Sequence, residues 1–252
     1  MTVRNPQTRR QGLNTASKTS ESDLVESFLP QIHSLLGVPV SDLRVLRELG
    51  AGQRVADVVA ARNMRKKWLS LPQVLSVKES VLLAQLRVRG AMRIDRLEKR
   101  CGLSRGGLRD GSLDRLINAK VLKRQRGGVV ALARSTRSAV HVLAFEMKLT
   151  KWRDAVQQAR VYTKYADLSY VVLPPHSKKL SKKIESRCEQ AGVGLVFVDS
   201  SDYVVIRAAR RNHAHDWRRE YVLSRLLNGD SKQQLDGNTA ANSGRVACGV
   251  HC

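Results

Sequence analysis

Two ionisable side chains, Glu146 and Lys148, stand two residues apart at the end of the apolar run VLAFEMKL. A third, Asp57, interrupts a second apolar run, RVADVVAA. Both runs have the composition of buried strands, and a charge in a buried strand costs several kcal/mol unless it is paired or bound to a cation. The three residues are therefore candidates for a site that does chemistry.

If the two runs are neighbouring strands, Asp57 and Glu146 face each other and could hold a divalent ion through oxygen ligands, as Mg²⁺ requires. Lys148 shares the face of Glu146, because strand residues two apart point the same way. It could reach a metal-bound water or a scissile phosphate, help to deprotonate or orient the nucleophile, and offset developing charge. We therefore expect Mg²⁺, or Mn²⁺, with Asp57 and Glu146 as metal ligands.

The segments on either side of these runs alternate between helical and strand patterns. Apolar spacing predicts a helix over 22–36, a strand hairpin over 43–61 and a strand over 138–149. It then predicts helices over 152–165, 177–192 and 214–227, and strands over 169–174, 193–199 and 203–208. This order predicts an α/β core with a mixed central sheet flanked by helices.

With Asp57 and Glu146-x-Lys148 in this order of elements, the chain resembles the PD-(D/E)xK nuclease superfamily. Gln158 and Tyr162 lie four residues apart in QARVY, which is similar to the QxxxY motif of the RecB-like branch. The resemblance covers residues 22–61 and 138–206 and implies a restriction-endonuclease-like core. It also implies that Gln158 and Tyr162 line the active site beside the metal, contacting substrate or orienting catalytic groups.

Many members of this family carry a further glutamate on the first helix or first strand, and both Glu26 and Glu48 compete for that place here. Glu26 is the favoured candidate because it lies on the predicted first helix. Two features depart from the family. No proline precedes Asp57, and the connection between the two carboxylate strands is long enough to hold a whole domain.

That connection, residues 62–137, reads as three short helices followed by a hairpin that turns at Gly127-Gly128, the order of a winged helix-turn-helix. Its predicted core comprises Leu97, Leu103, Leu113, Leu116 and Ile117. The predicted DNA contacts are Arg105, Arg109 and Arg115 on the recognition helix and Lys123, Arg124 and Arg126 near the wing. A solvated charged face or a protein-docking module is the alternative interpretation of the same residues.

Charge supports a polyanionic partner. The chain has 45 Lys and Arg against 22 Asp and Glu, a net charge of +23, and residues 62–137 alone carry 20 basic and 5 acidic residues. No transmembrane helix or secretory signal is expected, and four scattered cysteines fit a reducing compartment, so we expect a cytoplasmic protein. The predicted domains are a disordered basic arm (1–20), a core in two parts (21–61 and 138–228), the insertion (62–137) and a disordered tail (229–252).

These features together predict a Mg²⁺-dependent nuclease that hydrolyses phosphodiesters in duplex or branched DNA held by the inserted module. Three alternatives stay open: a non-catalytic DNA-binding regulator built on a nuclease-like core, a nuclease that acts on RNA, and a nuclease subunit of a larger complex. A homodimer is a further expectation, because nucleases that cut both strands are often symmetric.

Overall fold

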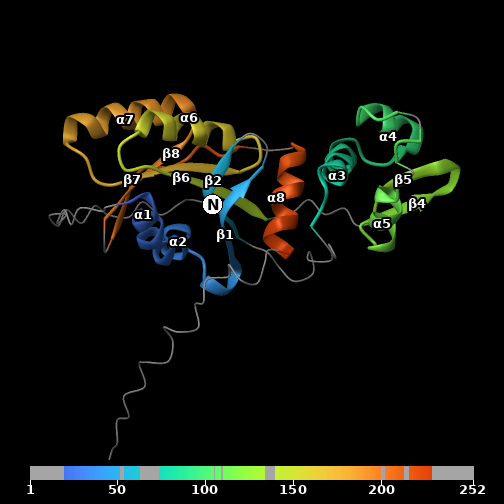
Figure 1. Cartoon of the computed structure of the whole chain (residues 1–252), viewed down its shortest axis with the longest axis horizontal. Coiled ribbons are helices and arrows are strands. Elements are labelled where there is room, and N and C mark those ends of the chain that lie inside the picture. Colours follow the sequence, from blue (N-terminus) through green and yellow to red (C-terminus); the bar gives the residue numbers. More distant parts are fainter. Residues whose placement is uncertain are drawn as a thin grey trace, which may run out of the picture.

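The computed structural model describes residues 20–51, 54–62, 74–104, 106–108, 110–133, 140–199, 202–212 and 216–228. The larger part is a six-stranded sheet with helices on both faces, and the smaller part, residues 74–133, combines helices with a three-stranded antiparallel sheet (Figure 1). The predicted α/β class is confirmed. Residues 1–19 and 229–252, which include nearly all of the predicted arm and the whole predicted tail, lie outside the described residues.

The large sheet is mixed, as the sequence predicts. Its strands follow the order β1-β2-β6-β7-β8-β9, with parallel pairing of β7 to β6 and β8 and antiparallel pairing elsewhere. The strand bounds are β1 (Leu43–Gly50), β2 (Val55–Arg62), β6 (His141–Met147), β7 (Leu168–Leu173), β8 (Gly194–Val198) and β9 (Tyr203–Arg207).

Helices cover both faces of this sheet and bury alternate strand residues (Figure 1). One face packs against α6 (Trp152–Tyr162), α7 (Lys178–Ala191) and α8 (Trp217–Asn228), and the other against α1 (Glu21–Phe28) and α2 (Ile32–Leu36). In β7, Val171 and Leu173 join the α6 and α7 core, whereas Tyr170 and Val172 join the core beneath α1. This two-sided burial explains why β7 reads as a continuous apolar run.

The helix predicted over residues 22–36 is divided in the structure. A short 3₁₀ segment, Leu29–Gln31, separates α1 from α2 and contains Pro30. Proline has no backbone N–H to donate, and its ring crowds the preceding turn of a helix. Ser20 and Asp23 form a reciprocal capping box that starts α1.

The smaller part has its own apolar core. Its elements are α3 (Val77–Arg89), β3 (Met92–Arg93), α4 (Ile94–Arg100), α5 (Ser112–Asn118), β4 (Leu122–Gln125) and β5 (Val129–Leu132). Of the predicted core residues, Leu97, Leu113 and Leu116 are buried, and Leu103 and Ile117 are partly buried against them. The β4–β5 turn contains Gly127 and Gly128 with φ of 73° and 69°, a backbone that favours glycine. Strand β3 was not predicted, because two residues carry too little pattern.

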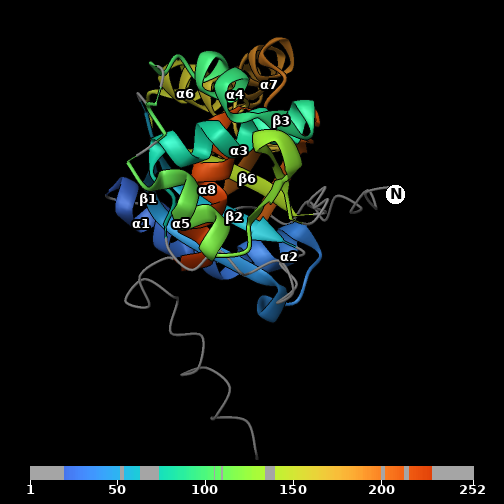
Figure 2. The same cartoon turned by 90° about the vertical axis from the view of Figure 1, so that its right-hand side faces the viewer.

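Helix α8 connects the large sheet to the smaller part. It packs on the sheet through Val222 and Leu226 and lies beside α3 on its other side (Figure 2). Glu220, which is buried, forms an ion pair with Arg87 of α3, and Ser224 Oγ accepts a hydrogen bond of 3.1 Å from the Leu75 N–H. None of the helices in the described residues is long and apolar enough to cross a membrane.

A buried ion pair fixes α8 to the sheet. Arg219 Nη1 lies 2.8 Å from Asp167 Oδ2, and the same oxygen accepts a 2.7 Å hydrogen bond from the Val142 N–H. Arg219 also donates to the carbonyls of Tyr165 and Val140. Both charged side chains are about nine-tenths buried, so the pair is held in place by four contacts.

We expect Arg219→Ala to lower the free energy of unfolding by about 3–5 kcal/mol, because it leaves Asp167 charged, buried and unpaired. The matched control is Arg124→Ala, which removes an exposed pair with Asp114 and should cost at most about 1 kcal/mol. Urea denaturation followed by circular dichroism measures both values. Equal losses in the two variants would contradict the structural role of the buried pair.

Candidate active site

The candidate site lies where β2 and β6 stop pairing. Their antiparallel ladder ends at Val58 and Phe145, and its register places Asp57 opposite Glu146 one residue further on. There the Met147 N–H donates a 2.6 Å hydrogen bond to the Asp57 carboxylate and not to a backbone carbonyl of β2. The N–H of Lys148 already bonds to the Val172 carbonyl of β7 at 3.2 Å. Because the ladder stops here, two carboxylates can lie side by side where the pairing of β2 and β6 ends.

Glu146 is 1% exposed and points to the sheet face covered by α6. Its Oε2 lies 2.6 Å from the hydroxyl of Tyr162, the last residue of α6. The same hydroxyl is 2.7 Å from the Val55 carbonyl oxygen. The Tyr162 hydroxyl can donate its proton to either oxygen, so it binds the Glu146 carboxylate or the Val55 carbonyl.

Burial and the charge of Asp57 together raise the pKa of Glu146 to about 7, although Tyr162 and Lys148 oppose the shift. Burial also raises the pKa of Asp57, although the Met147 N–H and Lys148 oppose the shift. When Asp57 and Glu146 are both ionised, they carry more negative charge than Lys148 neutralises. This is the electrostatic environment that a divalent cation relieves.

Lys148 spans the two acidic sides of the site. Its Nζ lies 3.3 Å from Glu146 Oε1 and 3.0 Å from Oε2 of Glu21, the first residue of α1. Burial alone would lower the pKa of Lys148, but Glu21, Asp57 and Glu146 together raise it. The lysine therefore stays an ammonium at neutral pH, which favours charge stabilisation over proton abstraction.

Two further residues, Gln158 and Tyr165, lie within α6 and just after its end. Gln158 is half-buried one turn before Tyr162, as the QxxxY spacing requires. Tyr165 packs its ring 5.8 Å from that of Tyr162, and its buried hydroxyl has no hydrogen-bond partner in the described part of the chain. Sequence reasoning missed Tyr165, because an aromatic residue just after a helix is usually core.

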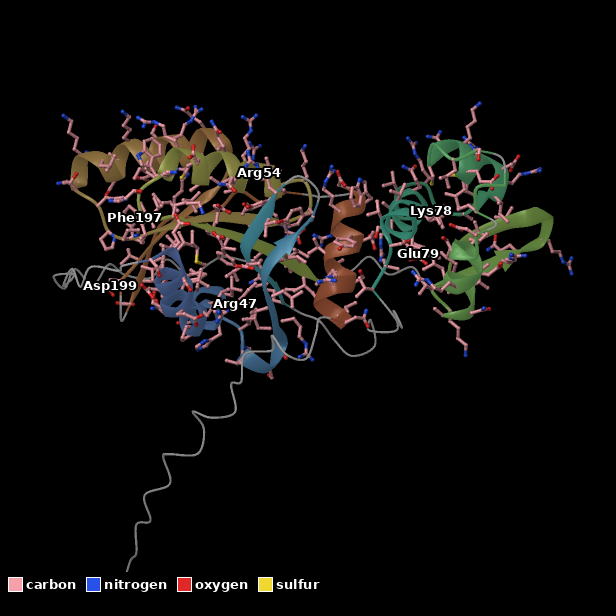
Figure 3. All side chains as sticks on the ribbon, viewed as in Figure 1. Arg47, Arg54, Lys78, Glu79, Phe197 and Asp199 are labelled. Atoms are coloured by element: carbon pink, nitrogen blue, oxygen red, sulfur yellow. The ribbon has the colours of Figure 1, made fainter. Side chains whose placement is uncertain are left out.

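The structure brings some of the candidate glutamates to the site and not others. Glu26 is exposed and pairs with Arg47, on the side of the sheet that carries α1 and α2 (Figure 3). Glu48 lies opposite Asp57 in the β1–β2 register and its charge raises the pKa of Asp57. It has a φ of 50°, which costs a non-glycine residue about 1–2 kcal/mol. Glu21, which contacts Lys148, was not predicted, since nothing separates it in sequence from other helix-capping acids.

The predicted DNA-contact residues of the smaller part take different places. Lys123, Arg124 and Arg126 are exposed on β4 and the turn after it, with Arg124 paired to Asp114 at 2.6 Å. Arg115 instead donates from its Nε and Nη2 to the buried Glu79 of α3 (Figure 3). This internal contact links α5 to α3. Arg105 and Arg109 lie outside the described residues.

Among the described residues, no group of three or more His, Cys, Asp or Glu side chains is arranged to hold a metal ion. Asp57 and Glu146 are the two carboxylates at the point where β2 and β6 stop pairing, and Mg²⁺ commonly takes one or two carboxylates and fills its other positions with water and substrate phosphate. The repulsion between the two carboxylates supports this fit.

Comparisons with known proteins add little. No protein-family model and no curated protein matches the sequence. Among solved structures, the chain is similar to a protein of unknown function from Silicibacter pomeroyi, with 13% identity and a TM-score of 0.30, over 69% of this chain and 99% of that one.

The raised pKa of Glu146 predicts a specific dependence of stability on pH. The folded protein holds the Glu146 proton up to about pH 7, whereas the unfolded chain releases it near pH 4.5. Stability from this group is complete below the unfolded pKa and is lost as the pH rises through the folded pKa. Glu146→Gln should therefore stabilise the metal-free protein by about 3 kcal/mol at pH 8 and by under about 1 kcal/mol at pH 5.

Urea denaturation in EDTA at the two pH values tests this expectation. Glu189→Gln is the matched control, because Glu189 is exposed in an ion pair with Arg207 and should change little at either pH. Parallel pH profiles for wild type and Glu146→Gln would show that the carboxyl group titrates normally.

Proposed function

We propose that the protein is a Mg²⁺-dependent DNA nuclease with a restriction-endonuclease-like core and a winged-helix module in residues 74–133. The observation that carries the proposal is the convergence of Asp57, Glu146 and Lys148 where β2 and β6 separate. The order of elements in the core and the position of Tyr162 against Glu146 support it. These are the features on which the resemblance to the PD-(D/E)xK superfamily rests.

In this proposal Asp57 and Glu146 hold the metal through their carboxylate oxygens. A bound Mg²⁺ supplies Lewis acidity toward the scissile phosphate and lowers the pKa of attacking water. Lys148, held as an ammonium by Glu21 and Glu146, faces the negative charge that develops on the phosphate. Tyr162 fixes the Glu146 carboxylate through its hydroxyl, and Gln158 stands one turn away to contact substrate.

The order α3, β3, α4, α5, β4, β5 supports the winged-helix assignment, with α5 as the second helix of the helix-turn-helix and the β4–β5 turn as the wing. Lys123, Arg124 and Arg126 are exposed beside that turn, and Arg124 is paired with Asp114, so we assign Lys123 and Arg126 to the phosphates of duplex DNA. Arg115 is left out of this assignment, because its guanidinium is engaged by Glu79.

A second candidate function is a DNA-binding regulator whose core no longer cuts. It is favoured by the fact that Glu146, once protonated, is satisfied by Tyr162 and Lys148 without any metal. Both candidates bind DNA, and they differ in whether a divalent metal enters the site. The alternatives of RNA as substrate and of a partner subunit are outcomes of the same assays.

We expect Asp57→Ala and Glu146→Ala to abolish cleavage while DNA binding persists, because each removes one of two carboxylates assigned to the metal. Lys148→Ala should keep Mg²⁺ binding and lose on the order of a hundredfold in rate. Single-turnover cleavage of linear, branched and single-stranded DNA, beside Mg²⁺ titration calorimetry, measures both effects.

Glu189→Ala is the control for cleavage, since its exposed pair with Arg207 is structural. The variants Glu26→Ala and Glu48→Ala separate the two further candidates, and the larger loss is expected for Glu48→Ala, which lies opposite Asp57. Cleavage by the wild type that survives EDTA, or normal cleavage by Glu146→Ala in Mg²⁺, would overturn the nuclease proposal.

The wing assignment makes a separate prediction about duplex binding. The double variant Lys123→Ala/Arg126→Ala should weaken duplex affinity several-fold and reduce the slope of log affinity against log salt by about 1.8, because two fewer phosphates are neutralised. Lys99→Ala/Lys179→Ala removes the same charge from other exposed positions and serves as control. Fluorescence anisotropy at several salt concentrations gives both slopes, and equal slopes would place the duplex elsewhere.

A further inference from the structure

Four arginines surround one hollow on the smaller part of the protein. Arg89 ends α3, Arg93 lies in β3, and Arg96 and Arg100 follow on α4. The hollow has a volume of about 320 Å³, and its other lining residues are Ala91, Met92 and Val129. Arg93, Arg96 and Arg100 are spaced by three and four residues, so they form one stripe along α4 and the residue that precedes it.

Of these four arginines, only Arg93 forms an ion pair with another described residue. Arg93 meets Asp95 at 3.3 Å in a pair whose side chains are both about 70% exposed, which makes the pair weak. Arg89, Arg96 and Arg100 have no ion-pair partner among the described residues, and no carboxylate lines the hollow. Four cations held this close repel each other, so the hollow is suited to an anion.

A second hollow of about 340 Å³ adjoins the first and shares Arg89 and Arg100 with it. Its wall is formed by Val81, Ala84 and Val88 of α3 and by Trp217, the first residue of α8. Val88 is 55% exposed, which leaves apolar surface open to solvent beside the indole.

The one acidic residue in this second hollow is already balanced. Asp216 accepts hydrogen bonds from the Arg218 guanidinium at 2.7 Å and from the Arg218 N–H at 2.9 Å. The same guanidinium carbon lies 4.8 Å from the centre of the Trp217 ring. The two hollows thus join an arginine cluster to an apolar wall with an aromatic residue, and residues of α3, α4 and α8 line them.

We propose that this groove binds single-stranded DNA, with phosphates on the arginines and bases against Val88 and Trp217. Cationic grooves with aromatic platforms are the means by which proteins hold unpaired strands, because every base has a face that can stack. In duplex DNA the bases are already stacked and paired, so the apolar wall would have no partner. The proposal deepens the proposed function by assigning a substrate with an unpaired segment, and it rests on that function for the use to which the bound strand is put.

The groove is separate from the residues assigned to duplex DNA. Lys123 and Arg126 lie on β4 and the turn that follows it, and neither lines the two hollows. A branched substrate could therefore contact both surfaces at once, its duplex at the wing and its unpaired strand along α3 and α4. The groove also reaches α8, the helix that packs on the core sheet.

The test measures binding of a labelled 15-nucleotide oligothymidine by fluorescence anisotropy in EDTA, where the proposed cleavage is silent. Arg96→Glu/Arg100→Glu should weaken binding tenfold or more and reduce the salt slope by about 1.4, because two fewer phosphates of the single strand are neutralised. Lys99→Glu/Lys179→Glu makes the same change in net charge at exposed positions outside the groove and should leave most of the affinity.

Trp217→Leu separates stacking from charge. We expect it to weaken single-strand binding about tenfold with the salt slope unchanged, because it removes a stacking face and no cation. Circular dichroism confirms that each variant is folded, and binding of a blunt duplex should change little in both groove variants.

Three outcomes would overturn the proposal: equal losses in the two charge-reversed double variants, unaltered oligothymidine binding in the groove variants, or equal losses for duplex and single strand. Each is independent of the nuclease proposal. A wild-type protein that binds oligothymidine through this groove but cuts no DNA in Mg²⁺ would remove the proposed activity and keep the groove. The converse result, cleavage without groove-dependent binding, would remove only the groove.

Discussion

The electrostatic cost of placing Asp57 and Glu146 together on a buried sheet face is the constraint on which the rest of the site depends. Neighbouring groups offset part of that cost: the Met147 N–H binds Asp57, the Tyr162 hydroxyl binds Glu146, and Lys148 pairs with Glu146 and lowers the pKa of Asp57. Apolar side chains at these positions would have made the sheet easier to form. The chain keeps two ionisable groups that only a proton or a cation can fully compensate.

This compensation requires elements far apart in the sequence. Helix α6 must end near the end of β6 to bring Tyr162 to Glu146. Helix α1 must begin there to bring Glu21 to Lys148. These helices approach from opposite faces, so the site stands on the full three-layer arrangement (Figure 1). A local change in either helix would therefore alter the charge balance at β2 and β6.

The arginines of this basic chain occupy different electrostatic environments. Arg219, Arg87 and Arg115 each meet a buried carboxylate and hold the fold together. Arg89, Arg96 and Arg100 line a surface hollow and have no ion-pair partner in the described part of the chain. Net charge cannot distinguish the two groups, because an arginine contributes the same charge whether it is paired with a buried carboxylate or exposed at the surface. Only the position of the partner carboxylate separates them.

Sequence by itself determined the α/β class, the mixed sheet and the bounds of most elements, because apolar periodicity in β7, β8 and α6 reflects which side chains must leave water. It also predicted that Asp57 and Glu146 would be neighbours, since charged residues inside apolar strands stand out. Tertiary structure alone decided that Glu21 meets Lys148, that Glu26 pairs with Arg47 and that Arg115 turns inward to Glu79. These contacts join residues far apart in the chain through long side chains, whose partners depend on how helices pack and not on any local pattern.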